Sequence, residues 1–573
     1  MNQNTPTEAR RRRFLVHALP LAAVSVAAFA AGVLVSGDST ERDFVERFAH
    51  AWTQGDYAAM RAELAPASRA SYSPEDLEAA YAAAMRTATS TAISTGEPRG
   101  PLEQDGESVV ALPVEIETAA FGTVGGEIGI PVSDEGIEWR PELVFPGLAE
   151  GEKLERNSKL PRRAPILAAD RSPLAEGPAD DRTTNGTSGL VTGELAQPDR
   201  ARQREMSALG FPKDTPAGES GLELAFDSVL AGTPGGELIA SGGAEDRVLA
   251  ARDPVDGDAV RTTIDPKLQD ATAAALGATF GGAALLDARS GDVLGLAGVA
   301  FSAPQPPGST FKVITTTGAL EAKITKLGEE FPVTSGAVVG GREVANADDE
   351  LCGGNLVQSF AESCNSVFAP LGAELGGPKL VRTAELFGFN SPPSLYRPEA
   401  VALVDPPEST IPTKLGDDLT VGVSAIGQGE VLATPLEMAS VAQTIANDGV
   451  RSPTSLVRDP ELAGAYPDVT VTTPEVAGQL REMMIEVVKS GTGVAAALPD
   501  ATVAGKTGTA ELGTSSGEVI GDVEAAQDVD AWFTAFAPAE KPKYAVAVMV
   551  VNAGGDGGTI AAPIARAILD AAL

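Results

Sequence analysis

Three short motifs in the second half of the chain constrain its fold more than any other feature. They read Ser309-Thr310-Phe311-Lys312, Ser363-Cys364-Asn365 and Lys506-Thr507-Gly508-Thr509. Each motif is weak alone, because such short patterns also occur by chance. Together, and in this order, they supply a hydroxyl nucleophile, a basic amine and polar groups that can clamp a carboxylate. We therefore predict that the fold brings all three motifs to one site.

The first motif predicts a nucleophile beside its base. It follows Pro306-Pro307, so we expect a helix that holds Ser309 in its first turn and Lys312 one turn further on. The helix N-terminus favours negative charge on the serine oxygen, and a desolvated lysine near other cations can act as general base. The two histidines, His17 and His50, both lie near the N-terminus. A Ser-His-Asp triad or a histidine zinc site in the second half is therefore excluded.

The second motif holds two polar side chains that can face one side. Ser363 and Asn365 are two residues apart, which in extended or turn backbone aligns their side chains. We expect Ser363 to relay a proton to the leaving group. We expect Asn365 to position Lys312 and a substrate amide.

The third motif lies in 502–511, which reads as a strand. Alternation places Lys506 and Gly508 on one face and Thr507 and Thr509 on the other. Lys506 adds positive field, the two threonine hydroxyls can bind a substrate carboxylate, and Gly508 lets the substrate backbone approach. The backbone N–H groups of Ser309 and Thr509 are the natural oxyanion donors.

The two cysteines of the chain are Cys352 and Cys364, the second of which lies inside a motif. In an exported protein they can form a disulfide if a turn brings their Cα atoms within about 7 Å. The alternative is two small buried apolar residues. The residues alone leave both possibilities open.

The N-terminus predicts export. Arg10–Arg13 precede an uncharged stretch, Phe14–Val35, which as a helix spans ~33 Å and so crosses a bilayer. We expect a cytoplasmic tail at 1–13 and a single transmembrane anchor at 14–35, with everything after it outside the cytoplasm at the cell membrane. A cleaved signal peptide, with a site at Ala28-Phe29-Ala30, is the alternative and also exports the chain.

The length of 573 residues predicts about three to four domains, and the net charge of −36 disfavours a nucleic-acid partner. In 36–150, apolar residues at helical spacing precede alternating strand patterns, so we expect an α+β cone. Turn-rich sequence at 151–260 predicts an extended connector with short strands near 165–169, 189–195 and 237–240. In 261–573, strand patterns at both ends surround helices, which predicts one sheet closed by both ends of the domain.

The three motifs, at Ser309–Lys312, Ser363–Asn365 and Lys506–Thr509, resemble those of the penicillin-binding transpeptidase family. Gly427-Gln428-Gly429-Glu430, Ala446–Gly449 and Gly491-Thr492-Gly493 are similar to stretches around its motifs, and Trp139–Gly147 resembles the NTF2-like extension of some Gram-positive class B members. The resemblance implies a monofunctional, actinobacterial-type protein: an NTF2-like domain (36–150), a pedestal- or dimerisation-like connector (151–260) and a serine β-lactamase-like domain of antiparallel sheet flanked by helices (261–573). The connector departs from the family at Arg163-Ala164 and at 169–172, which lacks the usual Asp-Gly turn.

The resemblance implies peptidoglycan D,D-transpeptidation through an acyl-enzyme on Ser309, with no metal and no cofactor. Expected partners are peptidoglycan stem peptides on lipid-linked precursor, penicillin and other β-lactams, the membrane, and a membrane-embedded glycan polymerase. The rivals are a D,D-carboxypeptidase, a β-lactamase, and a non-catalytic cell-wall scaffold or β-lactam sensor. The long N-terminal region disfavours a β-lactamase, and three intact motifs disfavour a dead site.

Overall fold

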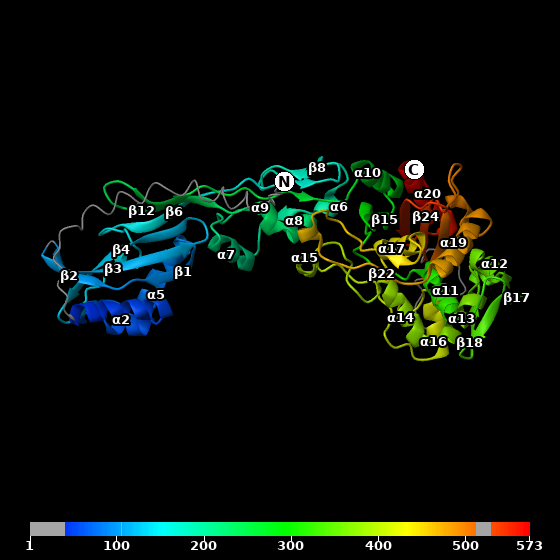
Figure 1. Ribbon diagram of the computed structural model, residues 1–573, viewed down its shortest axis with the longest axis horizontal. Helices are drawn as coiled ribbons and strands as arrows, with labels where there is room; N and C mark the ends of the chain where they lie inside the picture. Colours follow the sequence, from blue (N-terminus) through cyan, green and yellow to red (C-terminus); the bar gives the residue numbers. More distant parts are fainter. Residues whose placement is uncertain (1–39, 105, 512–528) are drawn as a thin grey trace, which may run out of the picture. The chain divides into compact units, whose positions relative to one another are not determined.

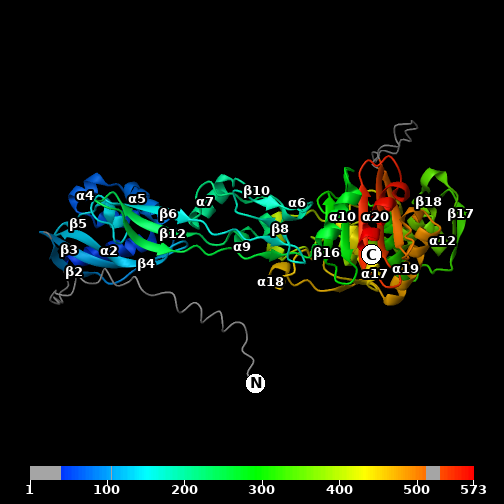
Figure 2. The same cartoon turned by 90° about the horizontal axis from the view of Figure 1, so that it is seen from above.

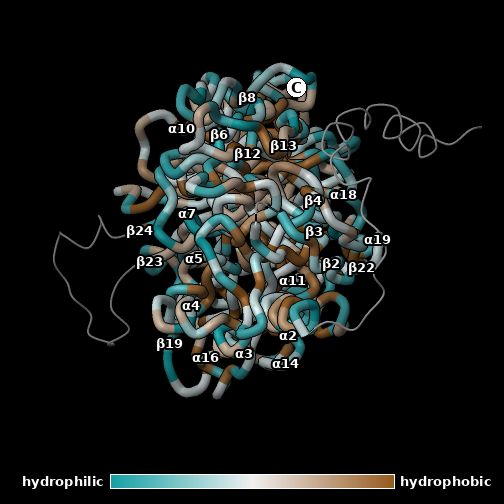
Figure 3. Tube along the Cα trace, turned by 90° about the vertical axis from the view of Figure 1, so that its left-hand side faces the viewer, coloured by the Kyte–Doolittle hydropathy of each residue, from teal (hydrophilic) through white to brown (hydrophobic). Residues whose placement is uncertain are grey.

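The computed structural model describes residues 40–104, 106–511 and 529–573. The cytoplasmic tail and the membrane anchor expected at 1–35 lie outside this part of the chain. Within the described ranges, no helix is both long enough and apolar enough to cross a membrane. The hydrophobic stretches of the described trace are short and interrupted (Figure 3).

The chain forms two compact units. The first comprises the described residues up to Asn157 together with Gly236–Arg252, and the second comprises Ser158–Gly235 together with Asp253–Leu573. The stretch 151–260 is therefore divided between them. Each unit is described by itself below.

The first unit begins with helices whose starts are written in the sequence. Apolar residues at helical spacing, as expected here, form the buried face of α2. A capping box at Ser73 starts a later helix, because the Ser73 side chain and the Asp76 side chain each accept a backbone N–H of the other residue. The helices are α2 (Thr40–Gln54), α3 (Tyr57–Ala62), α4 (Pro66–Ser71) and α5 (Pro74–Thr87).

An antiparallel sheet packs against these helices. Its strands are β1 (Ser90–Thr95), β2 (Arg99–Gln104), β3 (Glu107–Thr118), β4 (Gly122–Ser133) and β5 (Gly136–Ile137), in the order β1-β3-β4-β5 with β2 also on β3. The aromatic side chains of the helices enter the core, where the Trp52 and Tyr81 ring centroids lie 5.0 Å apart. Three further strands, β6 (Lys153–Lys159), β12 (Gly235–Ser241) and β13 (Arg247–Arg252), form a small sheet.

The connector part of the second unit is held by buried ion pairs. Arg163 contacts Glu223 at 2.5 Å and Asp227 at 2.9 Å, and the side chains of all three are almost fully buried. Around them lie β7 (Ile166–Leu167), β8 (Pro173–Glu176), β9 (Thr183–Thr184), α7 (Arg200–Ala208), β11 (Ala217–Gly218), α8 (Gly221–Ala225), α9 (Asp227–Ala231) and β14 (Val260–Arg261).

The strand predicted near 189–195 is wrong, and the structure shows how the turn at 169–172 forms. The strand expected near 189–195 is instead helix α6 (Gly189–Thr192) followed by β10 (Leu195–Ala196). A short apolar run does not distinguish a strand from one helical turn, and here the Thr192 hydroxyl donates back to Ser188 O as a helix allows. The turn at 169–172 forms without glycine, because Asp170 accepts bonds from both the N–H and the hydroxyl of Ser172.

The rest of the second unit is built on one antiparallel sheet. Its order is β16-β15-β25-β24-β23, so the strands that come first along this part of the chain pair with those near the C-terminus, as the sequence predicts. The bounds are β15 (Gly281–Asp287), β16 (Val293–Gly298), β23 (Ala504–Glu511), β24 (Val529–Ala537) and β25 (Tyr544–Val550). The placement of β23 at the edge leaves one side of this strand free to face another segment.

Helices cover both faces of this sheet (Figures 1 and 2). On one face α10 (Pro266–Leu276) and α20 (Ala562–Ala572) lie side by side, and on the other lies α17 (Pro435–Ala446). The helices that carry or flank the motifs are α11 (Lys312–Glu321), α12 (Leu356–Ala361), α13 (Asn365–Leu375), α14 (Gly377–Phe387), α16 (Asp418–Ala425) and α19 (Pro474–Lys489). Because α11 and α19 pack together beside the sheet edge, they bring the first motif towards β23.

Candidate active site

Ser309 lies in a tight turn ahead of a helix. Gly308–Phe311 form the 3₁₀ turn η2, and α11 continues from Lys312, so the nucleophile candidate sits just before the α-helix rather than within its first turn. Gly308 adopts φ of +53°, and a Cβ on it would lie 2.5 Å from Thr509 O. The absence of a side chain at Gly308 thus lets the serine turn lie directly against β23.

Lys312 is fully buried and held by a fixed set of acceptors. Its Nζ donates to Ser363 O and to Asn365 Oδ1, both at 2.7 Å, and lies 3.3 Å from Ser363 Oγ. The Phe368 ring lies beneath it, 5.6 Å from Nζ. A neutral amine has two N–H donors and one lone pair. The two short bonds use both donors and leave the lone pair available to accept a proton.

Burial sets the protonation of this amine. Desolvation, and after it the charge of Lys506, hold the pKa of Lys312 well below that of a free lysine. Both effects disfavour the ammonium form. The arrangement therefore favours a neutral base where the first motif requires one.

The second motif lies in the turn between α12 and α13, at the start of α13. Ser363 sits in the connecting turn at φ of +65°, a left-handed conformation that is unusual for serine and turns its carbonyl and hydroxyl to Lys312. Asn365 starts α13, and its Nδ2 donates to Ala345 O at 2.9 Å. This bond fixes which end of the amide faces Lys312.

A disulfide joins Cys352 to Cys364, with the Cα atoms 5.4 Å apart. It ties β20 (Cys352–Asn355) to the residue between Ser363 and Asn365. Of the two possibilities that the sequence leaves open, the structure contains the bridge. One wall of the site is thereby fixed covalently.

Lys506 approaches the same serine from the sheet. Its buried Nζ donates to Ser363 Oγ at 2.9 Å and to Thr507 O at 3.1 Å. Burial lowers the pKa of Lys506 to about 7. The Ser363 hydroxyl therefore lies between two amines, Lys312 on one side and Lys506 on the other.

The faces of β23 follow the expected alternation. Lys506 and Gly508 face the first two motifs, where Gly508 packs so closely on Pro307 O that a Cβ would lie 2.6 Å away. The hydroxyls of Thr507 and Thr509 lie on the other face, where Thr509 Oγ1 accepts the Gly557 N–H at 3.4 Å. The expected site residues of all three motifs thus meet at this edge of the sheet.

Several residues at the site were not singled out from sequence as site residues. Asn346 braces the second motif, because its Oδ1 accepts the Ser366 N–H at 2.9 Å. Gln428 Nε2 lies 3.4 Å from Thr509 O, and Thr492 contacts Thr507. Gln428 and Thr492 stand in glycine-flanked triplets, a signal that the chain passes close to another segment. Asn346 has no such signal.

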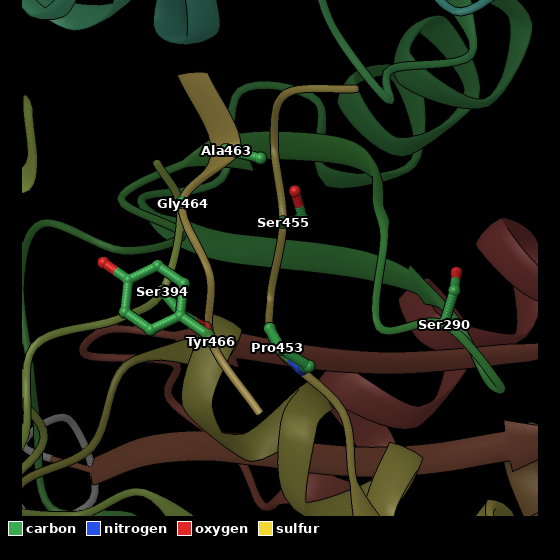
Figure 4. A pocket seen from close by; sticks show the side chains of 7 residues that line it. All are labelled: Ser290, Ser394, Pro453, Ser455, Ala463, Gly464 and Tyr466. Atoms are coloured by element: carbon green, nitrogen blue, oxygen red, sulfur yellow. The ribbon is translucent and has the colours of Figure 1, made fainter. Parts of the chain in front are cut away.

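A separate small pocket of about 140 Å³ contains none of the motif residues (Figure 4). Its lining includes Ser394, Ser455 and Tyr466. These hydroxyls already have protein partners, namely the Thr454 N–H, Val457 O and Tyr396 O respectively. We therefore assign no ligand to this pocket.

The fold and the three motifs are those expected of a penicillin-binding transpeptidase, and family comparisons agree. Residues 281–570 match the penicillin binding protein transpeptidase domain, and residues 41–152 match the NTF2-like N-terminal transpeptidase domain. The chain belongs to the penicillin-binding protein transpeptidase family.

Two of the relatives are mycobacterial transpeptidases. The chain is 38% identical over 294 residues to peptidoglycan D,D-transpeptidase PbpA of Mycobacterium tuberculosis, covering 48% of this chain and 56% of the relative. It is 34% identical to PbpA of Mycolicibacterium smegmatis, covering 62% of this chain and 79% of the relative. The match therefore spans little more than half the length of the M. tuberculosis relative.

Solved structures share the fold. Penicillin-binding protein A of M. tuberculosis, as a ceftriaxone acyl-enzyme complex, matches with a TM-score of 0.56 and 28% identity over 72% of this chain and 98% of that one. Pseudomonas aeruginosa PBP2 matches with a TM-score of 0.60 at 21% identity, over 73% of this chain and 97% of that one, which shows a common fold.

Proposed function

We propose that the chain is a peptidoglycan D,D-transpeptidase that cross-links stem peptides through an acyl-enzyme on Ser309. The observation that carries this proposal is the buried amine of Lys312, bonded to Ser363 O and Asn365 Oδ1 and placed one turn beyond Ser309. The relatives' names, and the acyl-enzyme complex of one of them, support the same activity.

The first half-reaction forms the acyl-enzyme. Ser309 Oγ attacks the carbonyl of the penultimate D-Ala while Lys312 Nζ takes the hydroxyl proton. The backbone N–H groups of Ser309 and Thr509 donate to the oxyanion. The C–N bond then breaks, and the proton that Lys312 took passes through the Ser363 hydroxyl, 3.3 Å from Lys312 Nζ, to the departing D-Ala amine. Ser363 Oγ also accepts a bond from Lys506.

The second half-reaction transfers the acyl group. An amine of a neighbouring stem peptide attacks the ester and loses its proton to the same lysine–serine pair. The ester C–O bond breaks, and Ser309 Oγ regains that proton. In the first half-reaction Thr507 and Thr509 bind the carboxylate of the terminal D-Ala, which later leaves with that residue, and Lys506 adds positive field beside it. A β-lactam, which carries both a reactive amide and a carboxylate, enters by the first half-reaction and stops there.

Export and attachment complete the proposal. The proposal includes a catalytic unit outside the cytoplasm, anchored beside lipid-linked precursor; the arginine block and the apolar stretch at 14–35 support it. Fractionation of cells that make the full chain or a chain lacking 1–37 tests this anchor. A membrane-embedded glycan polymerase is the partner that would supply the uncross-linked strands, and cross-linking at the membrane tests that contact.

The test of the activity is a transfer assay with a D-Ala-D-Ala stem peptide as donor and an amino-bearing stem peptide as acceptor. A cross-linked dimer and one released D-Ala per dimer are expected. Release of D-Ala without dimer indicates a carboxypeptidase, since water then replaces the amine. No release from either peptide contradicts the proposal.

A further inference from the structure

Thr492 connects two of the three motifs. It lies in the glycine-flanked loop after α19, and both its N–H, at 3.1 Å, and its hydroxyl, at 3.3 Å, point to Ala361 O. Ala361 ends α12, two residues before Ser363. On the other side Thr492 Oγ1 lies 2.5 Å from Oγ1 of Thr507, in the third motif.

The close fit of this loop fixes where the Thr492 backbone lies. A Cβ on Gly491 would clash with Ala361 O, and one on Gly558 would clash with Thr492 O. The residue itself is exposed, but its hydroxyl lies within hydrogen-bond distance of both Ala361 O and Thr507 Oγ1.

Proton counting shows what this hydroxyl can do. A threonine hydroxyl donates one proton and can accept bonds through its lone pairs. Thr492 therefore donates either to Ala361 O or to Thr507 Oγ1, but not to both. In the same way Thr507 donates either to Thr492 or to an incoming carboxylate.

We propose that Thr492 is a positioning residue that tunes the site for carboxylate-bearing substrates through Thr507. When a carboxylate accepts a hydrogen bond from the Thr507 hydroxyl, the Thr492 hydroxyl rotates and donates to Thr507 Oγ1. Ala361 O keeps a hydrogen-bond donor, because the Thr492 N–H still donates to it at 3.1 Å. The resulting chain of hydroxyl to hydroxyl to carboxylate strengthens each bond in it.

This inference rests on the proposed function and deepens it. Thr507 is only 5% exposed, so its hydroxyl has few directions in which to point, and its orientation depends on its neighbour. Thr492 acts on binding of the carboxylate and not on the attack of Ser309. The structure thereby separates the affinity for the substrate's acidic end from the chemical step.

The test compares benzylpenicillin with its methyl ester, which lacks the carboxylate charge, as acylating agents of the full chain. Thr492→Val keeps the shape and removes the hydroxyl. We expect it to lower the second-order acylation constant for benzylpenicillin about tenfold, through weaker initial binding, and to leave the ester unaffected. Thr492→Ser should restore the benzylpenicillin value, and Thr507→Val should also lower it.

An equal loss for both agents, or no loss, overturns the role of Thr492 and leaves the proposed function standing. Absence of any adduct on the unaltered chain overturns the proposed function itself. Thr492→Ala, with its melting temperature measured, replaces Thr492→Val if that variant fails to fold. Selective loss with the alanine variant carries the same meaning.

Discussion

Lys506 donates a 2.9 Å hydrogen bond to the hydroxyl of Ser363, and so joins the edge strand of the sheet to the turn between α12 and α13. The same oxygen lies 3.3 Å from Nζ of Lys312. One serine hydroxyl is thereby shared by two buried amines, and the charge of Lys506 lowers the pKa of Lys312. The chemistry of the site follows from this arrangement.

Replacing Lys312 by methionine should nearly abolish acylation. Methionine fills the buried space but removes the base that takes the proton of Ser309, and positioned general bases contribute roughly 10²- to 10⁴-fold. The second-order acylation constant for a penicillin measures the effect. Lys326→Met, which alters an exposed lysine beyond the same helix, is the control and should behave as the unaltered chain. A Lys312→Met protein that folds and still acylates at the normal rate would exclude Lys312 as base.

The acylation rate should fall as the pH falls, and the charge of Lys506 should influence the pH at which this acid limb of the profile lies. Burial lowers the pKa of Lys506 to about 7, and burial and the charge of Lys506 lower that of Lys312. Lys312 loses its activity as base when it gains a proton, so rate is lost on the acid side. Lys506→Met removes the neighbouring charge, which raises the pKa of Lys312. The acid limb of the variant should therefore move to higher pH. A limb that stays in place, or moves to lower pH, would show that Lys312 does not sense Lys506.

Removing the disulfide should loosen the second motif more than the rest of the unit. Cys352 and Cys364 are 12 residues apart, and closing a loop of that size contributes about 3 kcal/mol to the free energy of unfolding. A Cys352→Ala/Cys364→Ala double variant should lose stability of that order and acylate more slowly, since Ser363 and Asn365 flank Cys364. Denaturant unfolding and penicillin acylation measure the two effects. Unchanged acylation would show that the helix α13 fixes the motif without the bridge.

The buried ion pairs of the connector should matter far more than its exposed ones. Arg163→Met leaves Glu223 and Asp227 buried and short of a partner, which costs about 3–5 kcal/mol of unfolding free energy. Arg162→Met, one residue earlier, breaks only an exposed pair with Asp256 and should change stability little. Thermal unfolding of the two variants side by side provides the comparison. Equal destabilisation would contradict the structural role of the Arg163 cluster.

Much of the site could be predicted because motif chemistry and strand periodicity are local. The alternation of Lys506 and Gly508 against Thr507 and Thr509 needs only the two-residue repeat of a strand. Thr492 and Asn346 could not be assigned in the same way, because their roles come from contacts with residues distant in sequence. The short run at 189–195 misled for a different reason, since one turn of helix and one short strand look alike in composition.

The identity of Ser309 as nucleophile is the central claim, and intact mass after exposure to benzylpenicillin tests it most directly. The unaltered chain should gain the mass of one whole penicillin, because ring opening expels no atom, and should keep it for hours. Ser309→Ala should gain nothing under the same conditions. An adduct on Ser309→Ala, or none on either protein, would contradict the account, and rapid loss of the adduct with hydrolysed penicillin would point to a β-lactamase.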